Sequence, residues 1–174
     1  MKTYTENDYK SGDGMLTTVW GPGIWHFLHT MSFNYPNEPT KSDKIHYRNF
    51  ILNLENVLPC KYCRINLTKN FKKLPLTINH MKNRYMFSKY VYDLHEHINT
   101  MLNKKSGLSY NDVRERYEHF RARCTKKTIK IEKGCTESLY GEKSKCVIKI
   151  VPQSNKCKTF QMNRSCKKKR IKIS

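Results

Sequence analysis

The middle of the chain reads Leu58-Pro59-Cys60-Lys61-Tyr62-Cys63-Arg64. Two cysteines three residues apart, just after a proline, are typical of the start of a helix. The free N–H groups and partial positive charge of a helix N-terminus favour a thiolate, and Lys61 and Arg64 add full positive charges beside it. We therefore predict a reactive Cys60–Cys63 pair that can close a small, easily reduced disulfide.

The alternative interpretation of this pair is one half of a zinc site. A zinc site needs a second pair of ligands. The sequence contains no second Cys-x-x-Cys, and no His-x3-His follows at the spacing of a zinc finger. This context favours redox chemistry, and we predict no metal ligands.

Seven cysteines are a high count for a chain of 174 residues. The N-terminal stretch Met1-Lys2-Thr3-Tyr4-Thr5-Glu6 lacks the apolar segment of a secretory signal. No apolar run approaches the ~20 residues of a membrane helix. We therefore expect no membrane span and synthesis in a reducing compartment, where cysteines tend to be catalytic, redox-active or metal-bound.

The formal net charge is +20, and it is unevenly distributed along the chain. Residues 1–124 carry +8, whereas residues 125–174 carry +12. A tail of this charge is attracted to nucleic acid, anionic membranes or acidic proteins without specifying a reaction. We expect non-specific nucleic acid contact through it, and a solvated tail with no particular partner is the alternative.

Apolar residues at helical spacing predict a mainly α fold: a four-helix bundle plus a short fifth helix. The helices are expected to begin near Trp20, after a capping box at Thr40–Asp43, at the cysteine pair, near Met81 and after a cap at Ser109. The second has its apolar side at Tyr47, Ile51, Leu54 and Leu58, the fourth at Phe87, Val91, Leu94, Ile98 and Leu102, and the fifth at Val113, Tyr117, Phe120 and Cys124.

The character of the chain changes after Cys124. Three β-branched stretches predict strands in a small basic appendage: 145–151, 158–162 and 170–173. We therefore expect three parts: a flexible arm of residues 1–15, a helical domain of 16–124 and an appendage of 125–174. The remaining cysteines, whose state the pattern leaves open, are Cys124, Cys135, Cys146, Cys157 and Cys166.

Two polar pairs at helical spacing, Trp25/His29 and His95/Asn99, could face each other across the bundle. Flat rings with a few polar groups suit a planar cofactor held between helices, although core packing is the commoner role of such residues. The sequence has no Gly-x-Gly-x-x-Gly, so a Rossmann dinucleotide site is not indicated.

Four stretches in order carry a family resemblance: Trp20–Thr30, Tyr35–Thr40, Leu58–Cys63 and Leu94–Asn99. Together they resemble the Erv/ALR family of FAD-linked sulfhydryl oxidases over about residues 15–124. The run from Val113 to Arg121 and the added tail look most like the branch encoded by large DNA viruses.

The resemblance implies FAD at the mouth of the bundle, with the disulfide against its isoalloxazine ring. Cys60 would exchange with substrate and Cys63 would pass electrons to the flavin. The residues implied to bind the cofactor are Gly21, Trp25, His29, Tyr35, His95, Asn99, Lys104, Arg116 and Tyr117. Pro22 stands where the family has an arginine, and Tyr92 and Tyr110 stand where many cellular members have a structural disulfide.

By resemblance, the protein is a thiol oxidase that makes disulfides in substrate proteins and passes electrons to O2, giving H2O2. Thiol-containing proteins, among them a thioredoxin-like viral relay protein, are the implied substrates, and the implied assembly is a homodimer. The expected location is the host cytoplasm, in the virus factory or the virion. The competing interpretations are a basic nucleic-acid-binding protein and a zinc-stapled structural virion protein.

Overall fold

The computed structural model describes residues 4–125 and 134–138. The chain divides into two compact units, Met1–Gly107 and Leu108–Ser174. The sequence placed the boundary after Cys124 instead, and the limits 1–15, 16–124 and 125–174 stay predictions.

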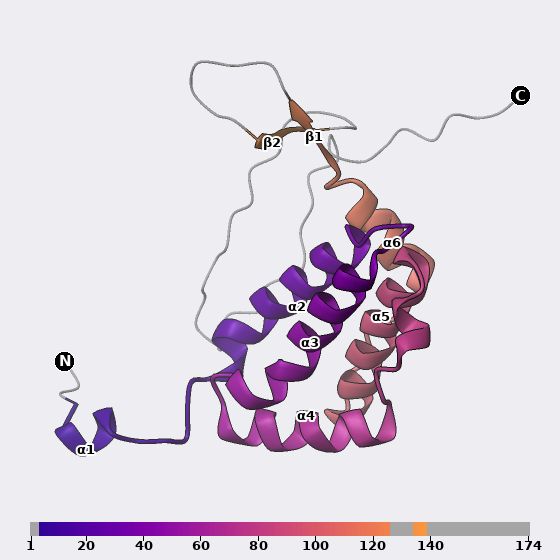
Figure 1. Cartoon of the computed structure of the whole chain (residues 1–174). Helices are drawn as coiled ribbons and strands as arrows, with labels where there is room; N and C mark the ends of the chain where they lie inside the picture. Colours follow the sequence, from indigo (N-terminus) through magenta and orange to yellow (C-terminus); the bar gives the residue numbers. More distant parts are fainter. Residues whose placement is uncertain (1–3, 126–133, 139–174) are drawn as a thin grey trace, which may run out of the picture. The chain divides into compact units, whose positions relative to one another are not determined.

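The first unit is helical. Its elements are α1 (Glu6–Tyr9), α2 (Thr17–Phe33), α3 (Lys41–Val57), α4 (Lys61–Lys73), a 3-10 turn η1 (Ile78–Met81) and α5 (Arg84–Met101). Helix α2 packs on α5, α3 packs on α4, and η1 contacts both α5 and α3. Figure 1 shows α2, α3 and α5 side by side, with α4 across one end. The predicted mainly α fold with a four-helix bundle is confirmed.

Helix α2 begins three residues earlier than the sequence predicted. It starts at Thr17, so Pro22 lies inside the helix and not in its first turn. Proline has no N–H to donate to the preceding turn, which is why it was expected at the start. The earlier start makes Thr17 the first residue of the helix.

Side-chain caps fix where α3 and α5 begin. Asp43 N–H donates to Thr40 Oγ1 at 3.1 Å, and Thr40 N–H donates to Asp43 Oδ2 at 2.9 Å, which confirms the predicted capping box. Met86 N–H donates to Asn83 Oδ1 at 2.9 Å and starts α5 at Arg84, three residues later than expected.

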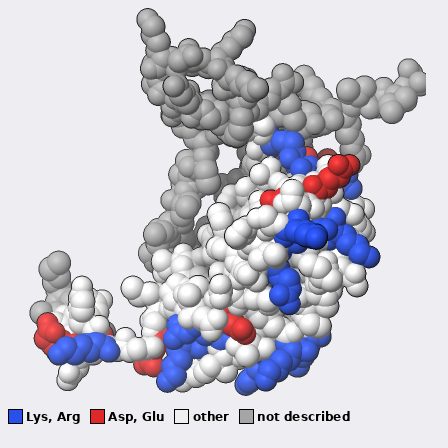
Figure 2. Space-filling model, in the orientation of Figure 1, with Lys and Arg blue, Asp and Glu red and all other residues white. Residues whose placement is uncertain are grey.

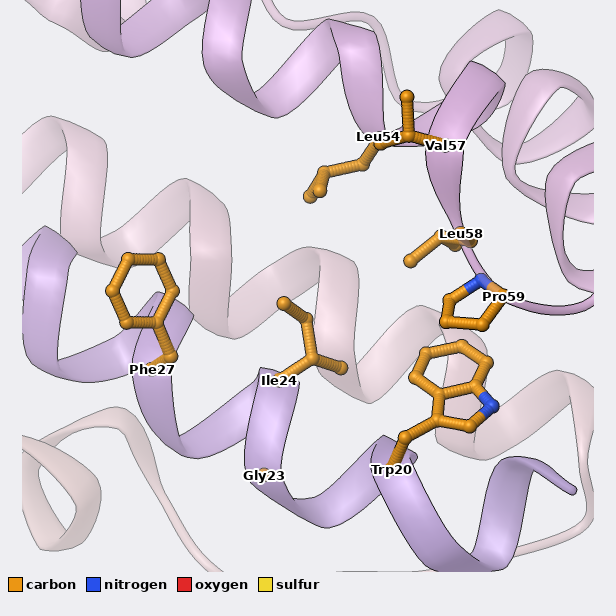
Figure 3. A pocket seen from close by; sticks show the side chains of 8 residues that line it. All are labelled: Trp20, Gly23, Ile24, Phe27, Leu54, Val57, Leu58 and Pro59. Atoms are coloured by element: carbon orange, nitrogen blue, oxygen red, sulfur yellow. The ribbon is translucent and has the colours of Figure 1, made fainter. Parts of the chain in front are cut away.

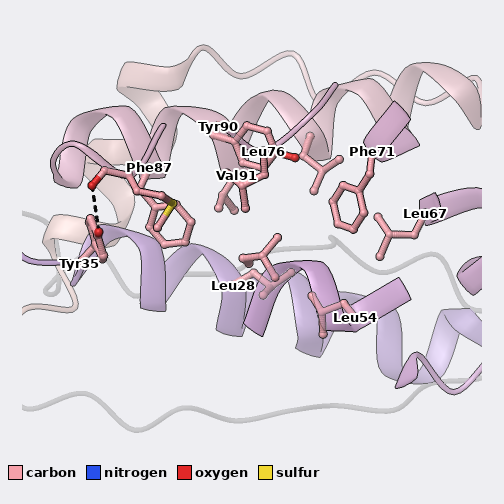
Figure 4. Close-up of a cluster of buried hydrophobic side chains, with 12 residues drawn as sticks. Leu28, Tyr35, Leu54, Leu67, Phe71, Leu76, Phe87, Tyr90 and Val91 are labelled. Carbon is pink, nitrogen blue, oxygen red and sulfur yellow. Dashed lines mark hydrogen bonds between the residues drawn. The ribbon is translucent and has the colours of Figure 1, made fainter. Parts of the chain in front are cut away.

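The core lies where the helical spacing placed it, except that Leu102 follows the end of α5 and is 50% exposed. On α5, Phe87, Val91 and Leu94 are buried, and on α3, Ile51 and Leu54 are buried. Figure 4 shows Phe87, Val91 and Leu54 meeting between the helices, together with side chains of α2, α4 and the segment before η1. No helix in the described part of the chain combines the length and apolar character needed to cross a membrane.

The second unit contains α6 (Tyr110–Glu118), β1 (Ala122–Thr125) and β2 (Gly134–Ser138). Ser109 caps α6 through a capping box with Asp112, as expected. The helix ends before Phe120, and Cys124 lies in a strand, because β1 pairs with β2 in an antiparallel ladder. The prediction of a helix reaching Cys124 was therefore wrong. The predicted strands 145–151, 158–162 and 170–173 lie outside the described residues.

Candidate active site

The cysteine pair lies at the first turn of α4, as the sequence predicted. Cys60 is the N-cap residue, and its Sγ accepts a hydrogen bond from Cys63 N–H at 3.4 Å. Both cysteines are half-buried. A sulfur in place of the usual Ser or Asp oxygen at an N-cap receives the helix's free N–H groups.

The two thiols are not equivalent. Hydrogen bonds from the Cys63 thiol and N–H lower the pKa of Cys60. Burial raises the pKa of Cys63, and its hydrogen bond to Cys60 raises it further. Cys60 is also the less buried of the two. Thiolate character is therefore concentrated on Cys60.

Residues 13–15 are hydrogen-bonded to the backbone around Cys60. Gly14 and Cys60 form an antiparallel bridge, in which Met15 N–H donates to Pro59 O at 2.5 Å and Lys61 N–H donates to Asp13 O at 3.1 Å. The sequence predicts a flexible arm of residues 1–15 here and indicates no role for it. The glycines of Ser11-Gly12-Asp13-Gly14 were the signal in the sequence, since glycine permits close backbone approach.

Two further groups act on Cys63. Thr17 Oγ1 lies 3.3 Å from Cys63 Sγ, and both this hydroxyl and the Arg64 guanidinium act to lower the pKa of Cys63. Arg64 Nη1 donates to Leu58 O at 2.5 Å, which holds the guanidinium beside the turn that precedes α4. Sequence reasoning found Arg64 but missed Thr17, because the contact spans 46 residues.

Helix α4 is strongly basic. It carries Lys61, Arg64, Lys69, Lys72 and Lys73 and no acidic residue. Figure 2 shows Lys and Arg side chains along the edge where Figure 1 places this helix. Positive charge beside the cysteines favours thiolates at the site and attracts anionic substrates.

A second cluster joins α2 to α5. The rings of Trp25 and His95 are stacked, with centroids 3.9 Å apart and planes 4° from parallel. His29 Nε2 and His95 Nδ1 lie 2.9 Å apart and share a hydrogen bond. The structure thus brings together Trp25, His29 and His95, as the spacing predicted.

Both histidines of this cluster are held neutral. Burial, followed by the neighbouring His95 and His26, lowers the pKa of His29 to about 3. Burial also lowers the pKa of His95 to about 4, with Glu96 opposing that shift and Lys104 adding to it. One neutral imidazole can donate to the other, so the pair forms without a buried charge.

The other predicted cofactor residues of the first unit lie around this cluster or in the core. Asn99 Nδ2 donates to Glu96 Oε1 at 2.9 Å, and Lys104 N–H donates to Asn99 O at 2.8 Å. Gly21 is buried in α2. Tyr35 has no exposed surface and donates to Met81 O at 3.0 Å, so cofactor contact would require this side chain to move.

Arg116 and Tyr117 lie in α6 of the second unit. Burial raises the pKa of Tyr117 to about 12, with the Arg116 charge opposing the shift. Their expected contact with the cofactor stays a prediction.

A pocket of about 380 Å³ lies between α2 and the end of α3. Figure 3 shows that its side chains come from Trp20, Ile24 and Phe27 on one side and from residues 54–59 on the other. All of them are apolar. A dinucleotide site requires polar groups to orient the ligand, so this pocket is a poor candidate for the cofactor.

Comparison with known protein families matches residues 22–132 to the Erv1 / Alr family. The chain belongs to this family. The match covers the cysteine pair and the Trp25–His29–His95 cluster of this Erv1/Alr protein.

Its relatives include a probable FAD-linked sulfhydryl oxidase of Acanthamoeba polyphaga mimivirus, 36% identical over 104 residues, covering 60% of this chain and 72% of that protein. The FAD-linked sulfhydryl oxidase of an African swine fever virus isolate is 31% identical over 99 residues, covering 57% of this chain and 80% of that one. The yeast Erv1 core has a similar fold, with a TM-score of 0.53 at 20% identity, over 67% of this chain and 92% of that one.

Proposed function

We propose that this Erv1/Alr protein is an FAD-linked sulfhydryl oxidase that makes disulfide bonds in thiol-containing substrates, with O2 as the electron acceptor. The observation that carries the proposal is the free Cys60–Cys63 pair at the head of a basic helix, in a chain whose viral relatives are named as such oxidases.

The residues on α2 and α5 fit FAD by their chemistry. An indole, two neutral imidazoles and a carboxamide offer flat surfaces and uncharged hydrogen-bonding groups, which suit a planar, polar cofactor. The space between Trp25 and His95 is closed, because these rings contact each other. Thr17, beside Cys63, and Trp25 are eight residues apart on α2, or about 12 Å along its axis.

The cysteines have different roles in the proposed reaction. A substrate thiolate attacks Cys60 Sγ, the less buried sulfur, and forms a mixed disulfide while the Cys60–Cys63 bond breaks. The electron pair of that bond leaves on Cys63 Sγ. A second substrate thiolate attacks the substrate sulfur of the mixed disulfide, and Cys60 leaves as a thiolate.

The cysteine pair has then gained two electrons, and the substrate has gained one disulfide. FAD held by the residues of α2 and α5 would supply the acceptor for these two electrons, and O2 with two protons would take them up as H2O2. The overall stoichiometry of the proposed reaction is two thiols and one O2 to one disulfide and one H2O2.

The test is a cysteine substitution in the full-length protein. Purified protein should show flavin absorption, and Cys63→Ser should keep the flavin but abolish its reduction by dithiothreitol. Tyr62→Phe, at an exposed position between the cysteines, is the matched control and should keep full activity. Full activity in Cys63→Ser, or protein that binds no flavin, would refute the proposal.

The implied homodimer has a candidate surface. The apolar pocket of α2 and α3 continues into exposed apolar side chains, with the rings of Phe27 and Phe50 5.9 Å apart and Val57 67% exposed. Two copies related by a twofold axis would each bury this face against the other. A second copy of the chain is therefore the proposed partner for this surface.

We also propose the remaining partners and the location, with support from the relatives and the charge. Relatives from large DNA viruses favour a location in the host cytoplasm, in the virus factory or the virion. The proposed substrates there are viral thiol proteins, including a thioredoxin-like relay protein. Non-specific nucleic acid contact through the basic residues 125–174 stays a proposal as well. The competing zinc-stapled structural function has no support from the comparisons.

A further inference from the structure

The segment of residues 13–17, here called the clasp, contacts both cysteines of the pair. Its backbone forms the bridge to Cys60, and its last side chain, Thr17, reaches Cys63 Sγ at 3.3 Å. Residues 13–16 of the clasp precede α2, and Thr17 is the first residue of that helix.

Gly14 makes this close approach sterically feasible. Its φ of +101° lies in the region that favours glycine, and a Cβ at this position would collide with the Pro59 carbonyl oxygen. Gly12, two residues earlier, has open space around the position of a Cβ. The requirement for glycine is therefore specific to the residue that pairs with Cys60.

The chemistry at Cys63 shows what the clasp contributes. Opening the Cys60–Cys63 disulfide requires Cys63 to leave as a thiolate, which its burial opposes. A thiolate has no proton to donate, so the Thr17 hydroxyl must be the donor in that state. Hydrogen bonds to a charged group are stronger than those to a neutral one, so the contact strengthens as the charge develops.

We propose that Thr17 is a catalytic residue whose hydroxyl stabilises the Cys63 thiolate when the disulfide opens, and that Gly14 is the residue that positions it. The substrate sulfur forms its bond with Cys60 Sγ, the Cys60–Cys63 bond breaks, and the electron pair goes to Cys63 Sγ beside the Thr17 hydroxyl. The titratable and charged neighbours that also act on Cys63 are Cys60 and Arg64.

This inference rests on the proposed oxidase function for its consequence, but its test needs neither FAD turnover nor O2. In full-length protein carrying Cys60→Ser, the rate at which iodoacetamide alkylates Cys63 is followed against pH. Mass spectrometry assigns the label to Cys63 and separates it from the other cysteines. The midpoint of this profile reports the pH at which the Cys63 thiolate forms.

We expect Thr17→Val to move the midpoint up by about one pH unit, and to slow alkylation about tenfold at pH values below it. Thr17→Ser should keep the original midpoint, because it retains the hydroxyl. Thr18→Val, at the exposed neighbouring position, is the matched control and should change nothing. An unmoved midpoint in Thr17→Val, or an equal shift in Thr18→Val, overturns the role of Thr17.

Gly14→Ala tests the positioning role separately, with Gly12→Ala as its control. We expect Gly14→Ala to raise the Cys63 midpoint as Thr17→Val does, and to speed amide hydrogen exchange at Met15 and Lys61, whose N–H groups form the bridge. Wild-type exchange and midpoint in Gly14→Ala would overturn the role of Gly14. Protein that shows these shifts but never reduces its flavin with thiols would sink the oxidase proposal alone.

Discussion

The imidazole of His95 lies flat on the indole of Trp25, with ring centroids 3.9 Å apart and planes 4° from parallel. Because Trp25 is on α2 and His95 on α5, this stack joins the two helices that carry the proposed cofactor residues. His29, one turn after Trp25, holds His95 from the side through a hydrogen bond of 2.9 Å. The three rings therefore form one connected cluster between α2 and α5.

Stability should fall as the pH falls from 7 to 5. The pKa of His29 is lowered to about 3 in the folded protein, whereas the unfolded chain binds a proton near pH 6.5. The unfolded state therefore binds more protons over this range, so the stabilisation is full above pH 6.5 and is lost toward pH 3. The shifted pKa of His29 alone should lower the free energy of unfolding at pH 5 by about 2 kcal/mol relative to its value well above pH 6.5.

Urea unfolding at pH 7 and pH 5 measures this loss of stability. The other titratable groups that act on His29 and His95 are His26, Glu96 and Lys104. His29→Gln removes the titration and should flatten the pH dependence. His46→Gln, at an exposed position, should follow the wild type. An unchanged slope in His29→Gln would contradict the prediction.

Trp25→Ala should weaken FAD binding while the helical bundle stays folded. The substitution removes the flat surface beneath His95 and leaves that ring without its stacking partner. Flavin absorbance retained after gel filtration measures the loss, and circular dichroism reports the fold. Trp25→Phe should retain more flavin than Trp25→Ala, and equal retention in the two variants would argue against a role for the ring.

Tyr35→Phe should destabilise the protein by about 1 kcal/mol. The Tyr35 hydroxyl donates to Met81 O at 3.0 Å in a site closed to solvent, and Phe would leave that carbonyl unpaired. Denaturant unfolding is the measurement, with Tyr9→Phe at a highly exposed position as the control. If Tyr35→Phe instead released flavin at unchanged stability, Tyr35 would have the cofactor role implied by resemblance.

Phe27→Glu should convert the proposed dimer to a monomer. The ring is 49% exposed and lines the apolar pocket of α2 and α3, where a buried carboxylate would be left without a partner. Sedimentation velocity gives the oligomeric state. Ile78→Glu, which adds the same charge at an exposed position on η1, should leave the state unchanged. Wild-type protein that sediments as a monomer would exclude this interface.

Local patterns in the sequence were sufficient to predict most of the bundle. The spacing of Ile51, Leu54, Phe87 and Val91 identified buried faces, because a helix repeats every 3.6 residues whatever surrounds it. The cap at Thr40 was equally readable, since a capping box involves only residues three apart. The same reasoning placed Cys60 and Cys63 at a helix N-terminus and put His29 on the same face as Trp25.

Contacts between distant segments could be known only from the tertiary structure. Three contacts depend on how whole helices pack, because each joins residues that are distant in the sequence. They are the stacking of Trp25 on His95, the burial of Tyr35 against Phe87 and Tyr47, and the approach of Thr17 to Cys63. The unequal thiols have the same origin, because burial and hydrogen bonds set their pKa values. The residue types thus defined the available chemistry, and packing decided which atoms could carry it out.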